Sequence, residues 1–397
     1  MWKRVGGALL LLVAAFGAFN YLRPIPPASA SVLVPRSDTV SGVAPVIPWP
    51  SHGSGAVAVS GLGFIASSGN EQPTSGASVT KVMTALIVLT DKPLKRGDAG
   101  PVITLTDVDV ESYRADVRGQ QSTVPVQAGE QLTELQALEA MLIPSANNIA
   151  ETLARWDAGS ITAFVAKMNS RASLLHLTHT KYADVSGADP GSVSTPTDLV
   201  ALGREAMKNE VFAQVVSMPQ AEIPVAGTVY NVDAVLGHQG IAGIKTGSGL
   251  NSGANFLFAA NVQVDGHPLV LYGCVMGQPT LEIAFAGAET LIGAVSQSLH
   301  VKRVVEKNQS IVTYTTAWGP QTDLVSGVDV DLVEWPGMVI RNRVDVNQLV
   351  VDHPLPAGSR EGTEHIVLGE YSLDVPLVTA DPLYPPGRFW RLTRLAI

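Results

Sequence analysis

A serine and a lysine, Ser78 and Lys81, stand at the start of a long apolar run, GASVTKVMTALIVL. Residues three apart on a helix lie on the same face, so the lysine amine can reach the serine hydroxyl. A serine hydroxyl needs an adjacent base to act as a nucleophile, and lysine can be that base when burial or a nearby positive charge lowers its pKa. The pair therefore fits acyl-transfer chemistry. The alternative is a lysine whose tip extends to water, and these two residues alone leave both interpretations open.

A second serine, Ser145, lies with Asn147 in the joint between two expected helices, GEQLTELQALEAMLI and NNIAETLARWDA. A loop that presents a hydroxyl and an amide can relay a proton and hold a substrate. The same residues can also form an ordinary N-cap for the second helix, which is the simpler interpretation of this segment by itself.

A third group, Lys245, Thr246 and Gly247, ends an expected strand in GIKTGSG. A lysine and a threonine at a strand end can hold a carboxylate through charge and a hydroxyl contact. A glycine beside them lets a ligand approach the backbone closely. A phosphate-binding loop is excluded, because the chain has no Gly-x-x-x-x-Gly-Lys-Thr/Ser pattern.

The segments that must position these groups predict an α/β unit over residues 55–300. GAVAVSGLGFIASSG is typical of two short strands, the residues after Ser78 are mostly helical, and NFLFAANVQV and HPLVLYGCVM are strand-like runs before a closing helix, TLEIAFAGAETLIGAVSQSL. This order predicts helices packed on an antiparallel sheet. In STPTDL, we give Thr195, Pro196 and Asp198 only the role of a helix cap.

Different patterns flank this unit. Residues 301–397 alternate apolar and polar side chains between turns, which predicts a small all-β domain that ends, at FWRLTRLAI, in a last strand or tail. At the other end, Lys3 and Arg4 precede an apolar run, so residues 1–23 are expected to be an export signal or, as we favour, an uncleaved membrane anchor. Residues 24–54, rich in proline and serine, are expected to be an extended tether. The rest of the chain then lies outside the cytoplasm, anchored to the cytoplasmic membrane.

The composition excludes several classes of protein and site. A net charge of -9 without a lysine and arginine cluster argues against nucleic acid as a partner. The single cysteine, Cys274, excludes an internal disulfide and zinc sites built from several cysteines. The eight histidines form no His-Glu-x-x-His pattern, so we expect neither a metal nor a cofactor. No Gly-x-Ser-x-Gly occurs either, which argues against an α/β-hydrolase.

The three motifs have more meaning together than apart. Ser-x-x-Lys, Ser-x-Asn and Lys-Thr-Gly occur here in an order that resembles the three motifs of serine penicillin-binding proteins and serine β-lactamases. The stretches GASVTKVMTAL, VQAGEQLTELQALEAMLIPSANNIAETLA and FVAKMNSRASLLHLTHTKYADVSG are similar to those of D-alanyl-D-alanine carboxypeptidases, the low-molecular-mass penicillin-binding proteins. The resemblance covers roughly residues 50–300, and the trailing β domain fits the family's layout. It implies a transpeptidase fold, with an antiparallel sheet and a helical block, and a cell-envelope enzyme whose partners are peptidoglycan stem peptides.

The resemblance also implies catalytic roles. Ser78 would attack the carbonyl of the terminal D-Ala-D-Ala bond, and Lys81 would take the serine proton. Ser145 would relay a proton to the leaving D-alanine. The backbone N–H groups of Ser78 and Ser248 would form the oxyanion hole. Water would hydrolyse the acyl-enzyme, and penicillins would acylate the same serine as inhibitors.

The remaining motif residues would bind the substrate. Asn147 would hold the peptide, and Lys245 and Thr246 would bind the terminal carboxylate beside Gly247. The chain departs from the family pattern at Gly249, where a serine or threonine is common, and at SGADPG, which replaces a His-Gly-Leu type of turn. Both changes concern the edge of the site.

Two other functions remain open at this stage. One is a β-lactamase of the same fold, which would need a second base for fast deacylation that no motif identifies. The other is a cell-wall binding or scaffold protein whose site is idle, although an idle site should tolerate losses in the three motifs and all three are intact.

Overall fold

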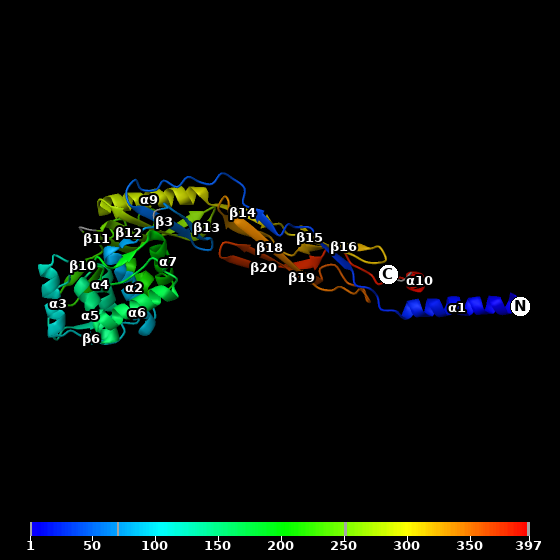
Figure 1. The fold of residues 1–397 in the computed structure, drawn as a ribbon, viewed down its shortest axis with the longest axis horizontal. Helices are drawn as coiled ribbons and strands as arrows, with labels where there is room; N and C mark the ends of the chain where they lie inside the picture. Colours follow the sequence, from blue (N-terminus) through cyan, green and yellow to red (C-terminus); the bar gives the residue numbers. More distant parts are fainter. Residues whose placement is uncertain (1, 70, 250–251, 395–397) are drawn as a thin grey trace. The chain divides into compact units, whose positions relative to one another are not determined.

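The computed structural model describes residues 2–69, 71–249 and 252–394. The chain forms two compact units (Figure 1). The larger unit comprises Pro45–Leu299, and the smaller one combines Met1–Ala44 with His300–Ile397. All three motifs lie in the larger unit.

The larger unit is built on a five-stranded antiparallel sheet with the strand order β11-β12-β13-β3-β4. Successive side chains of a strand point to opposite faces. In β12, Leu257 and Ala259 accordingly join the core beneath the helices, whereas the ring of Phe256 meets Phe285 of α9 edge-on at 5.0 Å. The bounds are β3 Ser54–Val59, β4 Gly63–Ser67, β11 Ile241–Gly249, β12 Gly253–Val264, β13 His267–Gln278 and α9 Leu281–Ser298. The expected closing helix, α9, is confirmed.

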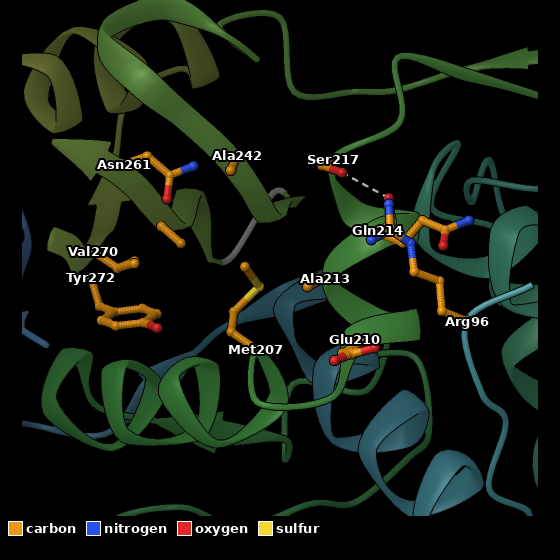
Figure 2. A pocket seen from close by; sticks show the side chains of 11 residues that line it. Arg96, Met207, Glu210, Ala213, Gln214, Ser217, Ala242, Asn261, Val270 and Tyr272 are labelled. Atoms are coloured by element: carbon orange, nitrogen blue, oxygen red, sulfur yellow. Dashed lines mark hydrogen bonds between the residues drawn. The ribbon is translucent and has the colours of Figure 1, made fainter. Parts of the chain in front are cut away.

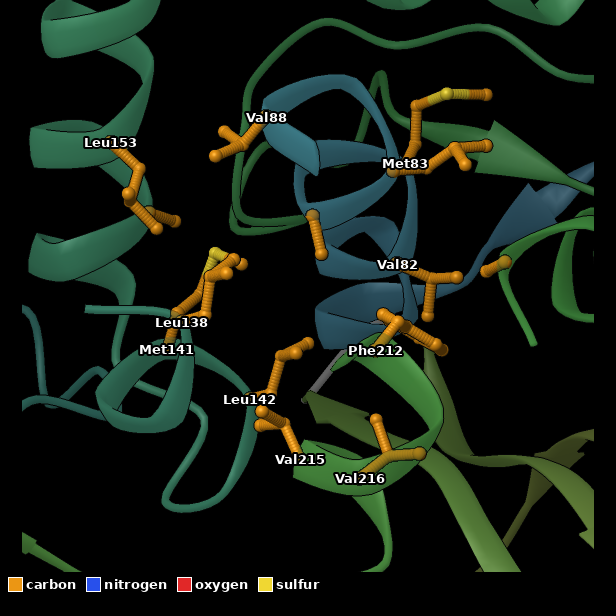
Figure 3. Packing of buried hydrophobic residues seen from close by; sticks show 14 of the residues in the cluster. Val82, Met83, Val88, Leu138, Met141, Leu142, Leu153, Phe212, Val215 and Val216 are labelled. Carbon is orange, nitrogen blue, oxygen red and sulfur yellow. The ribbon is translucent and has the colours of Figure 1, made fainter. Parts of the chain in front are cut away.

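A block of helices covers the other face of this sheet, and α7 packs directly on β3, β12 and β13. Its centre is α2, whose first nine residues are all buried. Figure 3 shows side chains of α2 meeting those of α4, α5 and α8 in one apolar cluster. The helices are α2 Lys81–Asp91, α3 Asp107–Arg118, α4 Glu134–Leu142, α5 Asn147–Ala158, α6 Ile161–Leu174, α7 Pro196–Ala206 and α8 Glu210–Val216, with short helices η1 Ala77–Thr80 and η2 His238–Gly240.

Short strand pairs and caps fix the ends of these helices. The pairs are β5 Thr74–Ser75 with β8 Val193–Ser194, β6 Val102–Thr104 with β7 Gln131–Thr133, and β9 Gln220–Ile223 with β10 Gly227–Tyr230. The cap predicted from STPTDL is confirmed: the Thr195 hydroxyl accepts the Asp198 N–H at 3.3 Å, and Pro196 is the first residue of α7.

The smaller unit contains a seven-stranded antiparallel sheet, β1-β15-β16-β20-β19-β18-β2, and a β14-β17 pair. Its strands are β1 Ser29–Val32, β2 Ser37–Thr39, β14 His300–Val305, β15 Ser310–Thr315, β16 Gln321–Ser326, β17 Val330–Glu334, β18 Val339–Val346, β19 Arg360–Leu368 and β20 Tyr371–Thr379. The segment expected to be a tether thus supplies both edge strands. Strands as short as β1 and β2 carry no detectable periodicity in the sequence. They are ordered by pairing with β15 and β18, which are distant in the sequence.

Two helices complete the smaller unit, α1 Trp2–Leu22 and α10 Arg388–Thr393. The expectation of a final strand or tail was wrong for α10. This helix is held by tertiary contacts, since the Arg394 side chain after it donates to the backbone oxygens of Asn20 and Pro24 near the end of α1. Within the part of the chain that the structure describes, no helix combines the length and hydropathy needed to cross a membrane.

Candidate active site

Ser78 and Lys81 meet where η1 runs into α2. Ser78 lies in the η1 turn and Lys81 is the first residue of α2, with its amine 2.8 Å from the Ser78 hydroxyl oxygen. The amine also donates to Asn147 Oδ1 at 2.6 Å and to the backbone oxygen of Ser186 at 3.1 Å. A neutral amine has two N–H groups and one lone pair. These two acceptors use both N–H groups, which leaves the lone pair for the serine proton.

The environment of Lys81 favours that neutral form. The side chain has 0% exposure, which excludes a lysine that extends to water. Burial lowers the pKa of Lys81 well below its usual value, and the positive charge of Lys245 lowers it further, against weaker opposing effects of Asp184 and Asp116. The buried position of Lys81 therefore has a chemical consequence, because a buried lysine gives up its proton more readily.

The middle motif contributes through Asn147 and the loop before it. Ala146, not Ser145, is the N-cap of α5, and it makes no side-chain cap hydrogen bond. Asn147 instead faces Lys81, and its Nδ2 donates to Gln121 Oε1 at 3.2 Å. Ser145 is held at a φ of 70°, and its buried hydroxyl has no hydrogen-bond partner among the described residues. The simpler interpretation, an ordinary N-cap, does not hold.

The third motif lies on β11, beside the η1 turn that carries Ser78. Lys245 and Thr246 are each 3% exposed, and the Lys245 amine donates to the Thr246 carbonyl at 3.2 Å. Burial lowers the pKa of Lys245 to about 7, and the nearby carboxylate of Asp233 acts in the opposite direction. Ser248 and Gly249, at the end of β11, are exposed.

Gly247 is needed for the approach of β11 to η1. A Cβ atom at this position would lie 2.4 Å from the Gly76 carbonyl oxygen and 3.1 Å from the Ser78 nitrogen. No side chain fits there without moving the turn that carries Ser78. The absence of a Cβ therefore serves the packing of the protein itself, in addition to the ligand approach expected from the sequence.

The sequence placed SGADPG at the edge of the site, and that was wrong, because its first residue, Ser186, presents its carbonyl to the Lys81 amine at 3.1 Å. The carboxylate of Asp184 accepts the N–H groups of Ser186, Gly187 and Ala188 at 3.1, 2.8 and 2.9 Å. Gly187 has a φ of +85°, and a Cβ there would lie 1.8 Å from the Ala77 carbonyl oxygen. An aspartate before Ser-Gly is a signal for such a turn. SGADPG thus reaches Lys81 through the Ser186 carbonyl.

No group of three or more His, Cys, Asp and Glu side chains is placed to hold a metal ion in the described ranges. Burial raises the pKa of the Cys274 thiol, which opposes formation of a reactive thiolate.

A separate open cavity of about 530 Å³ lies between α7, α8 and the strands β11 to β13. Figure 2 shows Arg96 and Glu210 on one side of it and Asn261, Val270 and Tyr272 on the other. It is lined by none of the motif residues.

Comparison with known proteins agrees with this geometry. The family model described as D-alanyl-D-alanine carboxypeptidase matches residues 62–280, a range that contains all three motifs. The carboxypeptidase DacB2 of Mycobacterium tuberculosis is 35% identical over 51% of this chain and 69% of its own length. The carboxypeptidase DacC of Escherichia coli is 25% identical over 83% of this chain and 84% of its own.

The fold has a solved relative as well. The structure of penicillin binding protein 5 from Haemophilus influenzae covers 86% of this chain and 99% of its own with a TM-score of 0.61 and 17% identity. At that identity the likeness concerns the fold alone. The fold is the mixed α/β transpeptidase fold of penicillin-binding proteins, followed by a β-rich region.

Proposed function

We propose, because this chain belongs to the D-alanyl-D-alanine carboxypeptidase family, that it removes the terminal D-alanine from peptidoglycan stem peptides through an acyl-enzyme on Ser78. The family consists of cell-wall peptidases that act outside the cytoplasm. The observation that carries the proposal is the fully buried Lys81 amine, 2.8 Å from the Ser78 hydroxyl and already supplied with two other acceptors.

Acylation begins at the serine. The Ser78 oxygen attacks the carbonyl carbon of the D-Ala-D-Ala bond while the neutral amine of Lys81 takes the hydroxyl proton. Negative charge develops on the substrate oxygen, and the backbone N–H groups of Ser78 and Ser248 stabilise it. Each such donor is worth roughly 10²–10³ in rate.

Collapse of the intermediate then breaks the carbon–nitrogen bond. The leaving amine needs one proton, and Lys81 returns the proton it took by way of Ser145, whose buried hydroxyl has no hydrogen-bond partner among the described residues and is free to take up this role. D-Alanine leaves and the shortened peptide stays as an ester on Ser78. Water hydrolyses this ester, and a penicillin that opens its ring on Ser78 follows the same first step.

Different residues bind the terminal carboxylate of the substrate and its peptide. Protonated Lys245 and the Thr246 hydroxyl hold the terminal carboxylate beside Gly247, which lets β11 pack closely on the turn of Ser78. Asn147 holds the stem peptide through Nδ2, which the substrate has to take over from Gln121 Oε1.

Release of D-alanine from a D-Ala-D-Ala pentapeptide tests the proposal, measured by chromatography for the wild type and for Ser78→Ala. Ser170→Ala removes an exposed serine from α6 and is the matched control. We expect release by the wild type and the control, and none by Ser78→Ala. Cleavage of cross-linked dimers without release from the pentapeptide would assign an endopeptidase instead, and rapid turnover of penicillin would assign a β-lactamase. If the protein reacts with neither peptide nor with penicillin, the remaining assignment is a cell-wall binding protein without catalytic activity.

Residues 1–23 are proposed to direct export and to attach the protein to the cytoplasmic membrane. In support, α1 leaves large apolar side chains such as Leu10 and Phe19 exposed, at 73% and 65%. Deletion of residues 1–23 should leave the protein in the cytoplasmic fraction, whereas the full chain should fractionate with the membrane. Recovery of the full chain from the soluble periplasmic or external fraction would contradict attachment.

A further inference from the structure

The side chain of Gln121 is exposed, yet hydrogen bonds hold both ends of its amide. Gln121 lies in the segment between α3 and β7. Its side-chain Nε2 donates to the Gly119 carbonyl at 3.1 Å, and its Oε1 accepts Asn147 Nδ2 at 3.2 Å. An exposed glutamine that rotates freely keeps more conformational entropy than one held in this way, so the ordered side chain calls for an explanation.

The partners of Gln121 fix the direction in which both amides face. The Gly119 carbonyl can only accept, so the Gln121 atom beside it is Nε2, and the atom that meets Asn147 is Oε1. An oxygen requires a donor opposite it, so the Asn147 atom at this place is Nδ2. Asn147 Oδ1 then faces the Lys81 amine, at 2.6 Å. A chain of hydrogen bonds therefore joins the exposed Gln121 to the buried amine beside Ser78.

The backbone of this segment is bound to the middle motif independently of the Gln121 side chain. The Asn147 N–H donates to the Ser122 carbonyl at 2.8 Å. Asn148, which is 1% exposed, accepts the Val124 N–H at 3.2 Å and donates to the Val124 carbonyl at 3.0 Å. Truncation of the Gln121 side chain should therefore leave the segment in place.

Gln121 Oε1 has the same chemistry as the substrate atom that Asn147 is proposed to hold. The carbonyl of a glutamine side chain and the carbonyl of a peptide bond are both neutral amide acceptors. Asn147 is 4% exposed, whereas Gln121 beside it is exposed. The free protein thus already presents an amide carbonyl to the donor that the stem peptide has to reach.

We propose that Gln121 is a specificity-determining residue that competes with the substrate: its side-chain carbonyl occupies Asn147 Nδ2 until the amide carbonyl of a ligand displaces it. This inference rests on the proposed function, in which Asn147 holds the stem peptide. A ligand with an amide carbonyl has to break one hydrogen bond to form another. A ligand without such a carbonyl leaves the bond of Gln121 in place. Gln121 acts through Asn147 and takes no part in the chemistry at Ser78.

Removal of the competing acceptor should favour ligands that contain an amide. A hydrogen bond between neutral groups changes an equilibrium about 2- to 10-fold, and Gln121→Ala should raise the second-order rate constant of acylation by such ligands by this factor. Gln121→Asn keeps the amide but is one methylene shorter, so it no longer reaches Asn147 and should behave as Gln121→Ala does. Acylation by ligands without the amide should stay at the wild-type rate in both variants.

The test measures acylation of the full chain by two ligands with intact-protein mass spectrometry. One is benzylpenicillin, which has an amide side chain, and the other is the penicillin nucleus with a free amino group in its place. Gln127→Ala, which truncates another exposed glutamine between α3 and β7, is the matched control. We expect both Gln121 variants to react faster than the wild type with benzylpenicillin and at the wild-type rate with the nucleus. The control should match the wild type with both.

Other results overturn the inference. A rise of the same size with both ligands would make Gln121 a steric obstacle only. A loss with benzylpenicillin would mean that Asn147 Nδ2 serves Gln121 and the ligand together through its two N–H groups. If the wild type forms no adduct with either ligand, the activated serine of the proposed function fails first, and the role of Gln121 falls with it. A reactive wild type whose two rates are unchanged in Gln121→Ala contradicts the inference alone.

Discussion

The Lys81 amine combines full burial with three hydrogen-bonding contacts at 3.1 Å or less. Burial lowers the pKa of Lys81 and so favours the neutral form, and the acceptors Asn147 Oδ1 and Ser186 O can use both N–H groups of that form, which leaves the lone pair for Ser78. Arginine at this position would stay protonated, because its pKa exceeds about 12 in proteins. The account therefore depends on an amine at this site rather than on a positive charge.

Lys81→Arg should slow acylation by penicillin about 10²–10⁴-fold, the usual contribution of a positioned general base. Lys81→Met, which is close in length, should be equally slow and should leave the acceptors Asn147 Oδ1 and Ser186 O unpaired, at about 1–3 kcal/mol each. Stopped-flow labelling and thermal unfolding measure the two effects. An arginine variant that reacts at the wild-type rate would contradict a proton-accepting role for Lys81.

At the residue scale the sequence predicted much of the site. The motif letters identified Ser78, Lys81, Asn147 and Lys245, and the structure brings the first three within hydrogen-bonding distance. The Ser186 carbonyl could not be predicted in the same way, since a backbone oxygen has no residue type. Its position depends on a turn shaped by Asp184 and on the packing of that turn against Ala77.

At the scale of elements, β11 and η1 approach so closely that a single Cβ decides whether they fit. Gly247→Ala would place a methyl group 2.4 Å from the Gly76 carbonyl oxygen, so the turn of Ser78 has to shift. Displacements of about 1 Å at a reacting group cost about 10²-fold in rate. Gly249→Ala, two residues along the same strand, would meet only the Ser252 hydroxyl at 3.0 Å, the end of a short side chain that can rotate away.

The two alanine variants should therefore differ clearly in the rate of acylation. We expect Gly247→Ala to lose acylation by about 10²-fold or more, and Gly249→Ala to stay near the wild type. Rates of penicillin labelling, with circular dichroism as a check on folding, measure both. Equal rates for the two variants would contradict the packing argument.

The start of α4 contains a buried acid, Glu134, whose carboxylate oxygens have no hydrogen-bond partner among the residues described. Burial raises the pKa of Glu134 to about 7, with Lys92 opposing and Asp157 reinforcing the shift. Since the folded-state pKa lies above the unfolded value, the folded state binds the proton more tightly. Stability is then fully present below the unfolded pKa and is lost as the pH rises through about 7.

Glu134→Gln should consequently raise the free energy of unfolding at pH 8, by about 1–3 kcal/mol, and leave it nearly unchanged at pH 4. Denaturant unfolding at the two pH values measures the difference. A stabilisation of the same size at both would show that the charge of Glu134 is not the cause.

The elements themselves were predicted with uneven success. Long apolar segments, such as α9 and the strands β12 and β13, were predicted, because their length and apolar composition are recognisable in the sequence. The strands β1 and β2 and the helix α10 were not, since four, three and six residues carry too little pattern and are ordered by contacts distant in the sequence.

At the scale of the whole molecule, the chain divides into two units with separate cores. Tyr314 is 1% exposed in the smaller unit, and its hydroxyl donates to the Asn347 carbonyl. Tyr314→Ala should cost about 3–5 kcal/mol, as for other large aromatic truncations. Because the three motifs lie in the other unit, penicillin labelling should be unaffected while calorimetry shows one transition at a lower temperature. Loss of labelling at a temperature where the variant's larger unit is still folded would contradict this independence.

The most direct measurement of the central claim is mass spectrometry of the full chain after reaction with penicillin, followed by peptide mapping. The account predicts one adduct, on Ser78, that is absent from Ser78→Ala and forms much more slowly in Lys81→Arg. An adduct on another residue, or one that survives Ser78→Ala, would contradict it. So would a protein that forms no adduct and turns over neither penicillin nor a D-Ala-D-Ala peptide.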